Sequence, residues 1–421
     1  MLNGTAFEWI HHEHVGRAAG LTTAHLAAIA DTSTTSSLSV LSQLQQAALA
    51  FTDASTQHIK VPDDVFANLR RELQANIDFQ KDNASNGIVD RQLVEATATV
   101  GGYNLVSRFL IALDVDDRAS QAVPIPHSPE QSVFEYPVLV ETPNVTLHVR
   151  VRFHTNPKAP AIIFINSLLT NTTLWDRVLP FFADDYTLIT YDQRGHGKSS
   201  CPPTKSTIPR LAQDVAHILD YLQIKVAHSV VGVSQGGATA LSFGLQYAHR
   251  VRRLIACDTQ ATSPATNKAT WDERIALARS GPDGMEKLAR ATAMRWFPKP
   301  GSSFAPAPGG GGVEEDFSYV SGMIASTDVE GFANSAAALQ SYDLRASGLA
   351  DVLRNAEREH GMRVLLLAGE LDGQLPRSLK GLRDEIGGRH VEFAEVKESG
   401  HLPMLDNPQE FGVTVSKFLR S

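Results

Sequence analysis

The stretch SVVGVSQGGATALSFG, Ser229 to Gly244, contains a run of β-branched residues, then a serine flanked by glycines, then helix-forming residues. The five residues from Gly232 to Gly236 fit the pattern Gly-x-Ser-x-Gly, in which a sharp turn from strand to helix exposes a serine hydroxyl. Small neighbours let the strand and the helix approach each other closely. The stretch therefore predicts a buried strand, a helix and a nucleophilic Ser234 between them. A glycine-rich turn without chemistry is the alternative interpretation.

Short apolar runs alternate with helical segments on both sides of this stretch. Residues 134–154 contain two runs that predict an antiparallel hairpin, and residues 208–223 have the spacing of an amphipathic helix. Buried strands separated by helices are typical of a doubly wound, mostly parallel α/β sheet, which is the fold class that we predict. Further strands are predicted at residues 159–166, 186–192, 250–258 and 362–370.

The N-terminal quarter of the chain has a different pattern. Residues 8–117 have helical spacing throughout, and Asp63 and Asp90 are candidate N-caps. The segment 118–132 contains three prolines and no apolar period, which is typical of a linker. The strongest helical periods predict helices over 39–52, 63–76 and 90–113.

A chain of this length is expected to form two domains, because typical domains contain roughly 100 to 200 residues. We place an all-α domain at 1–117 and an α/β domain at 133–421. Residues from about 261 to 345 interrupt the strand–helix alternation with helical segments, which predicts a helical cap over the ligand edge of the sheet. Within the cap, residues 304–316 contain prolines and four glycines and predict a mobile loop.

Composition limits the function classes. Of the 421 residues, 43% are apolar and 20% are charged, and no apolar run approaches the roughly 20 residues of a membrane span. The net charge of −8 and the scattered Lys and Arg residues argue against a nucleic-acid partner. The same charge distribution favours a small-molecule substrate. Cys201 and Cys257 have no metal-ligand spacing, so we expect neither a disulfide framework nor a structural zinc site. The candidate catalytic residues described below require no metal and no cofactor, so we expect none. Residues 1–18 lack the pattern of a secretory signal, so we expect a cytoplasmic location.

A serine hydroxyl is a poor nucleophile near neutral pH, so Ser234 requires an imidazole that is itself oriented by a carboxylate. The sequence has 15 histidines, and only His401 lies in a glycine-preceded loop, ESGHLPMLDNPQEF, after the last predicted strand. His360 and His390 lie in polar stretches typical of exposed residues, and His196 belongs to the turn DQRGHGKS. We therefore predict His401 as the general base.

The carboxylate partner is predicted from its position after a strand. In MRVLLLAGELDGQLP, Asp372 comes just past an apolar strand, where the loops of an open α/β sheet carry function. Its neighbour Glu370 and the more distant Asp343, in SYDLR, are alternatives.

The remaining requirement is a pair of donors for the oxyanion that forms when a carbonyl is attacked. The loop SLLTNTTLW follows the strand 159–166, and in this topology that loop supplies one backbone amide. We predict the amides of Leu168 and Gln235. Backbone amides have no side-chain signature, so this prediction depends on position alone.

Substrate selection is expected in the cap. Trp271, Arg274, Arg295 and Trp296 supply aromatic surface and positive charge, which suit a ring that carries a carboxylate. We favour Trp271, Arg295 and Trp296 as substrate-binding residues. Each of them fits cap packing or a surface charge equally well.

Residues 134–421 resemble the β-ketoadipate (3-oxoadipate) enol-lactonases within the α/β-hydrolases. The resemblance lies in FINSLLTNTTLWDRVLPFFADDYTLITYDQRGHGKSS, VVGVSQGG, MRWFPKP, GFANSAAALQSYDLR, AGELDGQLP and SGHLPMLDNPQEF. It implies that Ser234, Asp372 and His401 are the nucleophile, acid and base. Two positions depart from the family pattern: Leu169 replaces a glycine usual after INSL, and Gln235 replaces a methionine usual after the serine. We expect these departures to reshape the carbonyl pocket.

The N-terminal region resembles a truncated carboxymuconolactone decarboxylase. The matching stretches are EWIHHEHVGRAAGLT and QLVEATATVGGYNLVSRFLIALDV, over about residues 7 to 116. The resemblance implies a helical module that makes the protein a homo-oligomer, and His12 matches the family's histidine. We expect a degenerate, assembling domain, with a decarboxylase site at His12 as the alternative.

These observations predict a serine hydrolase that cleaves a lactone or related ester through an acyl-enzyme. Members of the two resembled families catalyse consecutive steps of one aromatic catabolic pathway, which favours an enol-lactone. The alternatives are a C–C bond hydrolase of a β-diketone, an esterase or lactonase of secondary metabolism, and an oligomeric scaffold with a vestigial pocket.

Overall fold

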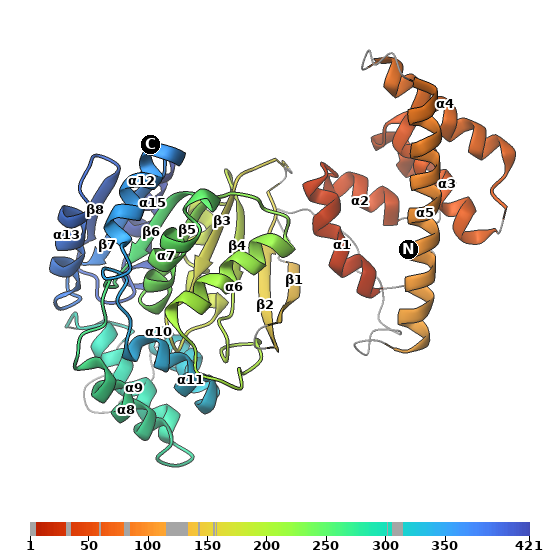
Figure 1. Ribbon diagram of the computed structural model, residues 1–421. Coiled ribbons are helices and arrows are strands. Elements are labelled where there is room, and N and C mark those ends of the chain that lie inside the picture. Colours follow the sequence, from red (N-terminus) through yellow and green to blue (C-terminus); the bar gives the residue numbers. More distant parts are fainter. Residues whose placement is uncertain are drawn as a thin grey trace. The chain divides into compact units, whose positions relative to one another are not determined.

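The computed structural model describes residues 6–30, 35–58, 60–79, 85–114, 134–141, 144–154, 156, 158–300, 302–304 and 315–421. The chain divides into two compact units (Figure 1). The first, called here the helical unit, comprises residues 1–131 and 155–158, and the second, the sheet unit, comprises residues 132–154 and 159–421. The predicted linker at 118–132 and most of the predicted loop at 304–316 lie outside the described residues.

The sheet unit is built on one eight-stranded sheet with the order β1-β2-β4-β3-β5-β6-β7-β8. Strand β2 is antiparallel to both of its neighbours, and all other neighbouring strands are parallel. The predicted hairpin and the doubly wound α/β architecture are therefore confirmed. The strands are β1 Phe134–Glu141, β2 Asn144–Arg152, β3 Ala161–Ile165, β4 Thr187–Tyr191, β5 Ala227–Val233, β6 Val251–Cys257, β7 Arg363–Gly369 and β8 Val391–Val396.

The strand order determines where a ligand site can form, at the carboxyl ends of the parallel strands. The chain goes from β3 to β4 on one side and returns to β5 on the other, so the carboxyl ends of β3 and β5 flank the point where the order reverses. Ligands of open α/β sheets bind in the crevice at such a point. The strands β3 and β4 are buried at every residue, which explains their uninterrupted apolar sequences.

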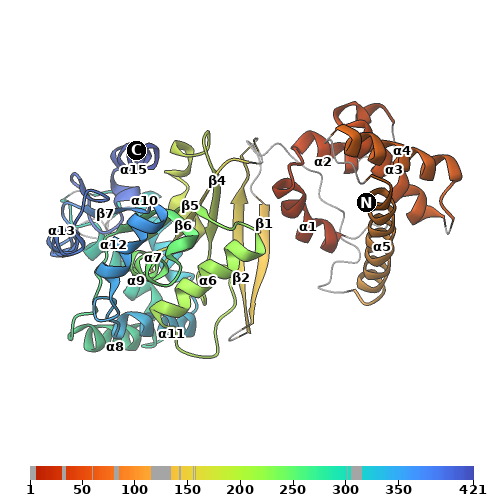
Figure 2. The same cartoon turned by 45° about the horizontal axis from the view of Figure 1, so that its top comes forward.

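Helices cover the sheet, as the two views in Figures 1 and 2 show. Helix α7 packs on β5 and β6 and against α6. Helix α15 packs near the 3₁₀ turns η3 (Thr172–Trp175) and η4 (Leu179–Phe181), where the rings of Phe411 and Trp175 lie 6.3 Å apart. The helices are α6 Ile208–Tyr221, α7 Gln235–Gln246, α12 Leu349–His360, α13 Leu375–Ile386, α14 Pro403–Asp406 and α15 Pro408–Arg420.

Four helices form the inserted cap between β6 and β7. Helix α10 packs against α9, and α11 packs against α8. In Figure 1 these helices lie together at one end of the sheet. They are α8 Asn267–Ala278, α9 Gly284–Trp296, α10 Glu315–Ala325 and α11 Val329–Gln340.

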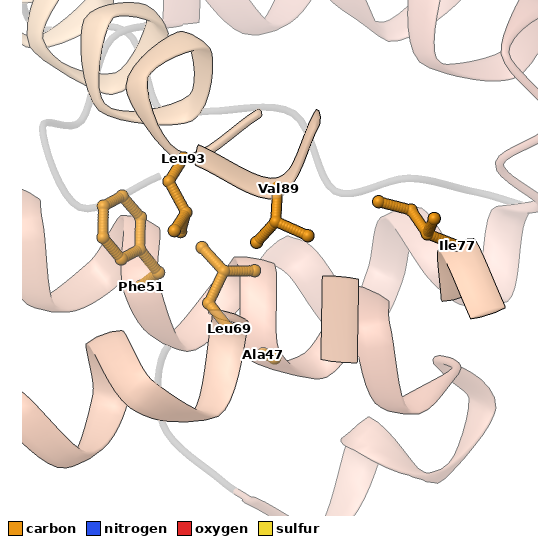
Figure 3. Close-up of a cluster of buried hydrophobic side chains, with 6 residues drawn as sticks. All are labelled: Ala47, Phe51, Leu69, Ile77, Val89 and Leu93. Atoms are coloured by element: carbon orange, nitrogen blue, oxygen red, sulfur yellow. The ribbon is translucent and has the colours of Figure 1, made fainter. Parts of the chain in front are cut away.

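The helical unit has a small core of its own. Figure 3 shows Phe51, Leu69, Val89 and Leu93 directed toward one another from α3, α4 and α5. Ser42 begins α3 with a capping box, in which its side chain and that of Gln45 bond each other's backbone amides. The helices are α1 Ala6–Ala18, α2 Thr23–Ala30, η1 Thr35–Val40, α3 Gln43–Gln57, α4 Asp63–Phe79 and α5 Ser85–Ala112.

The predicted N-caps of this unit are wrong in detail. Asp63 is the first residue inside α4, where its negative charge suits the helix N-terminus. Asp90 lies inside α5, and its carboxylate accepts a hydrogen bond from Arg70 at 2.5 Å. Helix α5 begins five residues earlier than predicted and includes Gly87. A glycine inside a helix has only a modest cost in helix propensity, so it does not prevent this earlier start. Of the described helices, none is both long enough and apolar enough to cross a membrane.

Candidate active site

Ser234 occupies the turn between β5 and α7. Its backbone has φ 58° and ψ −117°, a conformation that side-chain-bearing residues rarely adopt and that is common at functional sites. The Ser234 amide donates a hydrogen bond to the carbonyl of Cys257 at 2.9 Å, which fastens the turn to the end of β6. The hydroxyl lies at a cavity beneath the cap.

The glycines around Ser234 are required by close backbone approaches. A Cβ atom on Gly232 would lie 2.0 Å from the carbonyl oxygen of Gly236. A Cβ atom on Gly236 would lie 2.2 Å from the carbonyl oxygen of Ile165, at the end of β3. Both distances are far below van der Waals contact, so each position excludes any larger residue. The predicted strand-turn-helix context of the motif is thus present.

His401 lines the same cavity and is hydrogen-bonded to Asp372, which comes from a different loop. Asp372 follows β7, and His401 lies between β8 and α14. His401 Nδ1 is 2.7 Å from Asp372 Oδ2, and about 15% of each side chain is exposed. Burial by itself raises the pKa of Asp372, but the charge and hydrogen bond of His401 outweigh it, so the pKa lies below its usual value. Asp372 is therefore suited to hold His401 in one orientation.

The two alternative carboxylates lie elsewhere. Glu370 faces solvent and forms an ion pair with Lys397 at 3.1 Å. Asp343 is exposed and accepts hydrogen bonds from the Thr262 hydroxyl at 2.8 Å and from the Ala346 amide at 3.0 Å. The structure brings only Asp372 of these three carboxylates to His401.

The His401 loop is fixed against the cap. The His401 amide donates to the carbonyl of Trp296 at 2.8 Å, and the two rings stack with centroids 5.8 Å apart. A Cβ atom on Gly400 would lie 2.1 Å from the same carbonyl oxygen, which explains the glycine before the histidine. Trp296, predicted as a substrate-binding residue, lines the cavity and also positions His401.

The predicted oxyanion donors lie at the cavity with free amides. Gln235 is the first residue of α7, where helix amides have no intrahelical acceptor. Leu168 lies in the loop after β3 and lines the cavity. Across the described residues, neither of these two amides donates a hydrogen bond to the protein. Both are available to a carbonyl oxygen that develops negative charge.

His196, which the sequence analysis set aside, supports this loop. Leu169 has φ 69°, and its amide donates to His196 Nε2 at 3.0 Å. His196 Nδ1 in turn is 3.0 Å from the carbonyl of Arg194, so Nδ1 carries the proton and Nε2 accepts. Burial lowers the pKa of His196, which favours this neutral form. The glycine usual at position 169 is consistent with the left-handed backbone that Leu169 adopts here.

The side chain of Gln235 does not line the cavity, contrary to the expectation that it reshapes the carbonyl pocket. Its Nε2 donates to the carbonyl of Ser335 in α11 at 2.8 Å, and the Ser335 hydroxyl donates to its Oε1 at 3.1 Å. Both residues are fully buried. Gln235 therefore joins the turn that carries Ser234 to the cap.

The cavity has a volume of about 170 Å³, and two arginines line it. Trp271, Arg274 and Arg295 line it from α8 and α9, and the Arg274 guanidinium lies 4.5 Å from the centre of the Trp271 ring. Within the described part of the chain, neither arginine forms an ion pair. Crowding by protein atoms and the charge of Arg274 lower the pKa of Arg295 to about 10, although its side chain still faces the open cavity.

Asp258 is a second carboxyl group in the cavity wall, and the sequence analysis missed it. It follows β6 and is 1% exposed. Its Oδ1 accepts a hydrogen bond from the Gly369 amide at 2.8 Å. Burial, and then the charge of Asp372, raise the pKa of Asp258 well above its usual value. The available signal was its place after an apolar strand, the same signal that identified Asp372.

Fold and geometry define the class of protein. The sequence profile of the alpha/beta hydrolase fold family matches residues 160–408, and the chain belongs to this family. It is 30% identical to 3-oxoadipate enol-lactonase 2 of Acinetobacter baylyi over 264 residues, which cover 62% of this chain and 89% of that protein. The crystal structure of the enol-lactonase from Burkholderia xenovorans is 26% identical, with a TM-score of 0.55, covering 66% of this chain and 97% of that chain.

A second Acinetobacter baylyi protein, 3-oxoadipate enol-lactonase 1, is 29% identical over 279 residues and is covered to 94% of its length. The residues matched by the family profile lie wholly in the sheet unit. The resemblance of the helical unit to carboxymuconolactone decarboxylases stays a prediction. Among the described residues, no three His, Cys, Asp or Glu side chains are grouped in a way that would hold a metal ion.

Proposed function

We propose that the protein hydrolyses a lactone or related ester that carries a carboxylate. The observation that carries this proposal is the hydrogen bond of 2.7 Å between His401 and Asp372 at the cavity that Ser234 also lines. A strained serine, a histidine oriented by a carboxylate and two free amides are the parts that acyl transfer needs. They belong to an alpha/beta hydrolase whose relatives include proteins named enol-lactonases.

In the proposed first step, Ser234 Oγ attacks the carbonyl carbon while His401 Nε2 accepts the hydroxyl proton. Asp372 holds the proton on Nδ1 and stabilises the imidazolium. The amides of Leu168 and Gln235 donate to the oxyanion of the tetrahedral intermediate. When that intermediate collapses, the ring oxygen leaves as an enol or alcohol and takes the proton from His401.

The second step returns the enzyme to its starting state. His401 removes a proton from water, and the resulting hydroxide attacks the acyl-enzyme carbonyl. Ser234 then leaves with the proton that His401 carries. The product of a lactone is an open-chain acid, because the leaving oxygen and the acyl group belong to one molecule.

The cavity supports a small anionic substrate. A volume near 170 Å³ is close to the roughly 150 Å³ cavity that holds a benzene-sized molecule, so one ring with short substituents fits. The unpaired guanidinium groups of Arg274 and Arg295 suit a carboxylate, and Trp271 offers a ring face. These features favour a single-ring carboxylated lactone over a long-chain or neutral ester.

Product analysis tests the reaction class. The protein is incubated with a carboxylated enol-lactone, the matching neutral lactone and a carboxylated β-diketone, and the products are separated by chromatography. We expect ring opening of the carboxylated lactone, weaker turnover of the neutral one, and no C–C cleavage. Turnover of the diketone alone would replace the lactonase by a C–C bond hydrolase.

A fluorophosphonate probe tests whether the site is catalytic at all. We expect one covalent adduct, located at Ser234 by peptide mass spectrometry, and none in Ser234→Ala. Absence of the adduct in folded wild-type protein would favour a scaffold with a vestigial pocket.

A further inference from the structure

Asp258 is fastened to the turn that carries Asp372. The amide of Gly369 donates to Asp258 Oδ1 at 2.8 Å, and the carbonyl of Gly369 accepts from the Asp372 amide at 3.0 Å. The Asp258 amide donates to the carbonyl of Leu367 in β7 at 2.9 Å. These bonds fix the position of the Asp258 carboxyl group relative to the proposed acid of the triad.

The second oxygen of Asp258 has an unusual neighbour. Oδ2 is buried, and no N–H or hydroxyl group in the described part of the chain donates to it. After burial, the largest influence on Asp258 is the charge of the Asp372 carboxyl group, which raises the pKa of Asp258. Ionised carboxylates are acceptors only, so the buried Oδ2 can pair with Asp372 only if a proton lies between the two groups.

The surroundings decide which carboxyl group holds that proton. Asp372 has His401 at 2.7 Å, and the charge of Arg295 also favours its ionised form. Asp258 is 1% exposed, and the charged groups that act on it most, Asp372 and Asp406, are acidic. Arg274 and Arg295 line the same cavity, but within the described residues neither forms an ion pair with Asp258. An isolated buried carboxylate is strongly disfavoured.

We propose that Asp258 is a protonated carboxylic acid that donates a hydrogen bond to Asp372, so that the acid of the triad is a pair of carboxyl groups sharing one proton. This inference rests on the proposed triad of Ser234, His401 and Asp372. Asp258 acts through Asp372 and is therefore a positioning residue.

The pairing has a consequence for His401. The hydrogen bond from Asp258 withdraws negative charge from the Asp372 carboxylate, so Asp372 stabilises the imidazolium less than an unshared carboxylate would. The same bond occupies one side of the Asp372 carboxyl group and leaves Oδ2 for His401 Nδ1.

Two substitutions of Asp258 separate the charge from the hydrogen bond. Asp258→Asn retains both bonds, because the amide oxygen accepts from Gly369 and the amide NH₂ donates to Asp372. Asp258→Leu has the same branched shape, a larger volume and no donor. The measured quantity is the pH at which the rate of fluorophosphonate labelling of Ser234 falls on the acid side, which reports protonation of His401 without any assumed substrate.

The acid limb is the part of the pH profile in which the labelling rate falls as the pH decreases. We expect the acid limb of Asp258→Asn to lie at the same pH as that of wild type, with a labelling rate within about 3-fold. In Asp258→Leu we expect the limb to move to higher pH by about half a unit or more, because Asp372 regains charge. Circular dichroism melting of both variants shows that they are folded. If Asp258→Leu does not fold, the Asp258→Asn profile alone decides the charge state of Asp258.

Two results would overturn the inference. A limb that moves to lower pH in Asp258→Asn would mean that Asp258 is ionised, since the substitution then removes a negative charge near His401. An acid limb at the wild-type pH in folded Asp258→Leu would mean that Asp258 does not affect Asp372 through a hydrogen bond. Failure of wild-type Ser234 to react would instead refute the proposed function, so the two failures are distinguishable.

Discussion

The helical unit and the sheet unit differ in how completely each buries its own apolar residues. The helical unit has six residues in its core cluster, whereas β3, β4 and most of β5 to β7 are buried along their lengths. In the described chain, eight of the twelve exposed large apolar residues belong to the helical unit: Val40, Phe66, Val94, Tyr103, Leu105, Val106, Phe109 and Leu113. The sheet unit contains a complete candidate site, whereas the helical unit leaves many large apolar side chains exposed to solvent.

The exposed residues on α5 form a stripe. Leu105 and Phe109, with Leu113 just after the helix, recur every four residues and therefore lie on one helix face. Their exposed fractions are 72%, 59% and 61%. A contiguous exposed apolar face marks an interaction site. We propose that a second copy of the chain covers this stripe, so that the helical unit assembles the protein and the sheet unit performs its chemistry.

The largest effect is expected when the proposed nucleophile of the sheet unit is removed. We expect Ser234→Ala to lower kcat by about 10³-fold or more, because a triad without its nucleophile retains only binding and oxyanion stabilisation. The measurement is the rate of lactone hydrolysis at saturating substrate. His12→Ala, in the helical unit, is the matched control and should hydrolyse the lactone at the wild-type rate. A large loss in His12→Ala would mean that the helical unit takes part in the chemistry.

A change in the cap tests how the sheet unit selects its substrate. We expect Arg295→Ala to raise KM for a carboxylated lactone by about 10-fold to 100-fold, since a hydrogen bond to a charged group contributes about 1.5–3 kcal/mol. The value of kcat and the KM for a neutral ester should change little. Arg290→Ala, on the same helix but outside the cavity, controls for effects on α9. Equal losses for charged and neutral substrates would remove the carboxylate-binding role.

Assembly is tested on the full chain with Leu105→Glu and Phe109→Glu combined. We expect the mass measured by light scattering to fall by half or more, to that of one chain, because charge repels two apolar faces that meet across an interface. Hydrolysis should stay at the wild-type level. Thr99→Glu, at an exposed polar position of α5, should leave the mass unchanged. A wild-type protein that is already monomeric would contradict the proposal.

The smallest expected effect is on the pH dependence of stability, through His148 in β2. His148 Nδ1 is 2.9 Å from Asp192 Oδ2, and its Nε2 is 3.1 Å from Glu135 Oε2. Burial lowers the pKa of His148, but the hydrogen bonds and charges of these carboxylates outweigh it, so the pKa is raised. The stabilisation is complete below the unfolded pKa near 6.5 and is lost as the pH rises through the folded value.

We therefore expect the free energy of unfolding to fall by on the order of 1 kcal/mol as the pH rises from about 6 to above the folded pKa of His148. Urea unfolding at several pH values measures it. His148→Gln should have a flatter profile over the same range. An equal slope in both proteins would assign the pH dependence to other groups.

The sequence predicted the parts of the site that depend on local pattern. Ser234 lies in a motif whose glycines are required within a few residues, and Asp372 and His401 follow strands or precede a helix in recognisable loops. Such signals come from the backbone geometry of one segment. The strand boundaries were predicted for the same reason, because β3, β4 and β7 are buried on both faces and uniformly apolar.

The sequence did not predict the contacts between distant segments. Gln235 and Ser335 are 100 residues apart and are joined only by the fold. Asp258 follows an apolar strand, as many acidic residues do, so its sequence position alone does not identify it. Only its burial beside Asp372 distinguishes it. Helix α5 begins before its predicted start because tertiary packing of Val89 outweighs the weak propensity of the segment around Gly87.

Arg274 and Arg295, which form no ion pair within the described residues, also provide a way to search for the proposed ligand. Arg274 and Arg295 repel each other in the empty site, and an anion that binds between them relieves that repulsion only in the folded chain. Binding to the folded state raises the melting temperature, and the stabilisation grows with the logarithm of ligand concentration divided by Kd. A thermal-shift screen of small mono- and dicarboxylates can therefore rank candidate products and guide the choice of substrates before any turnover is measured.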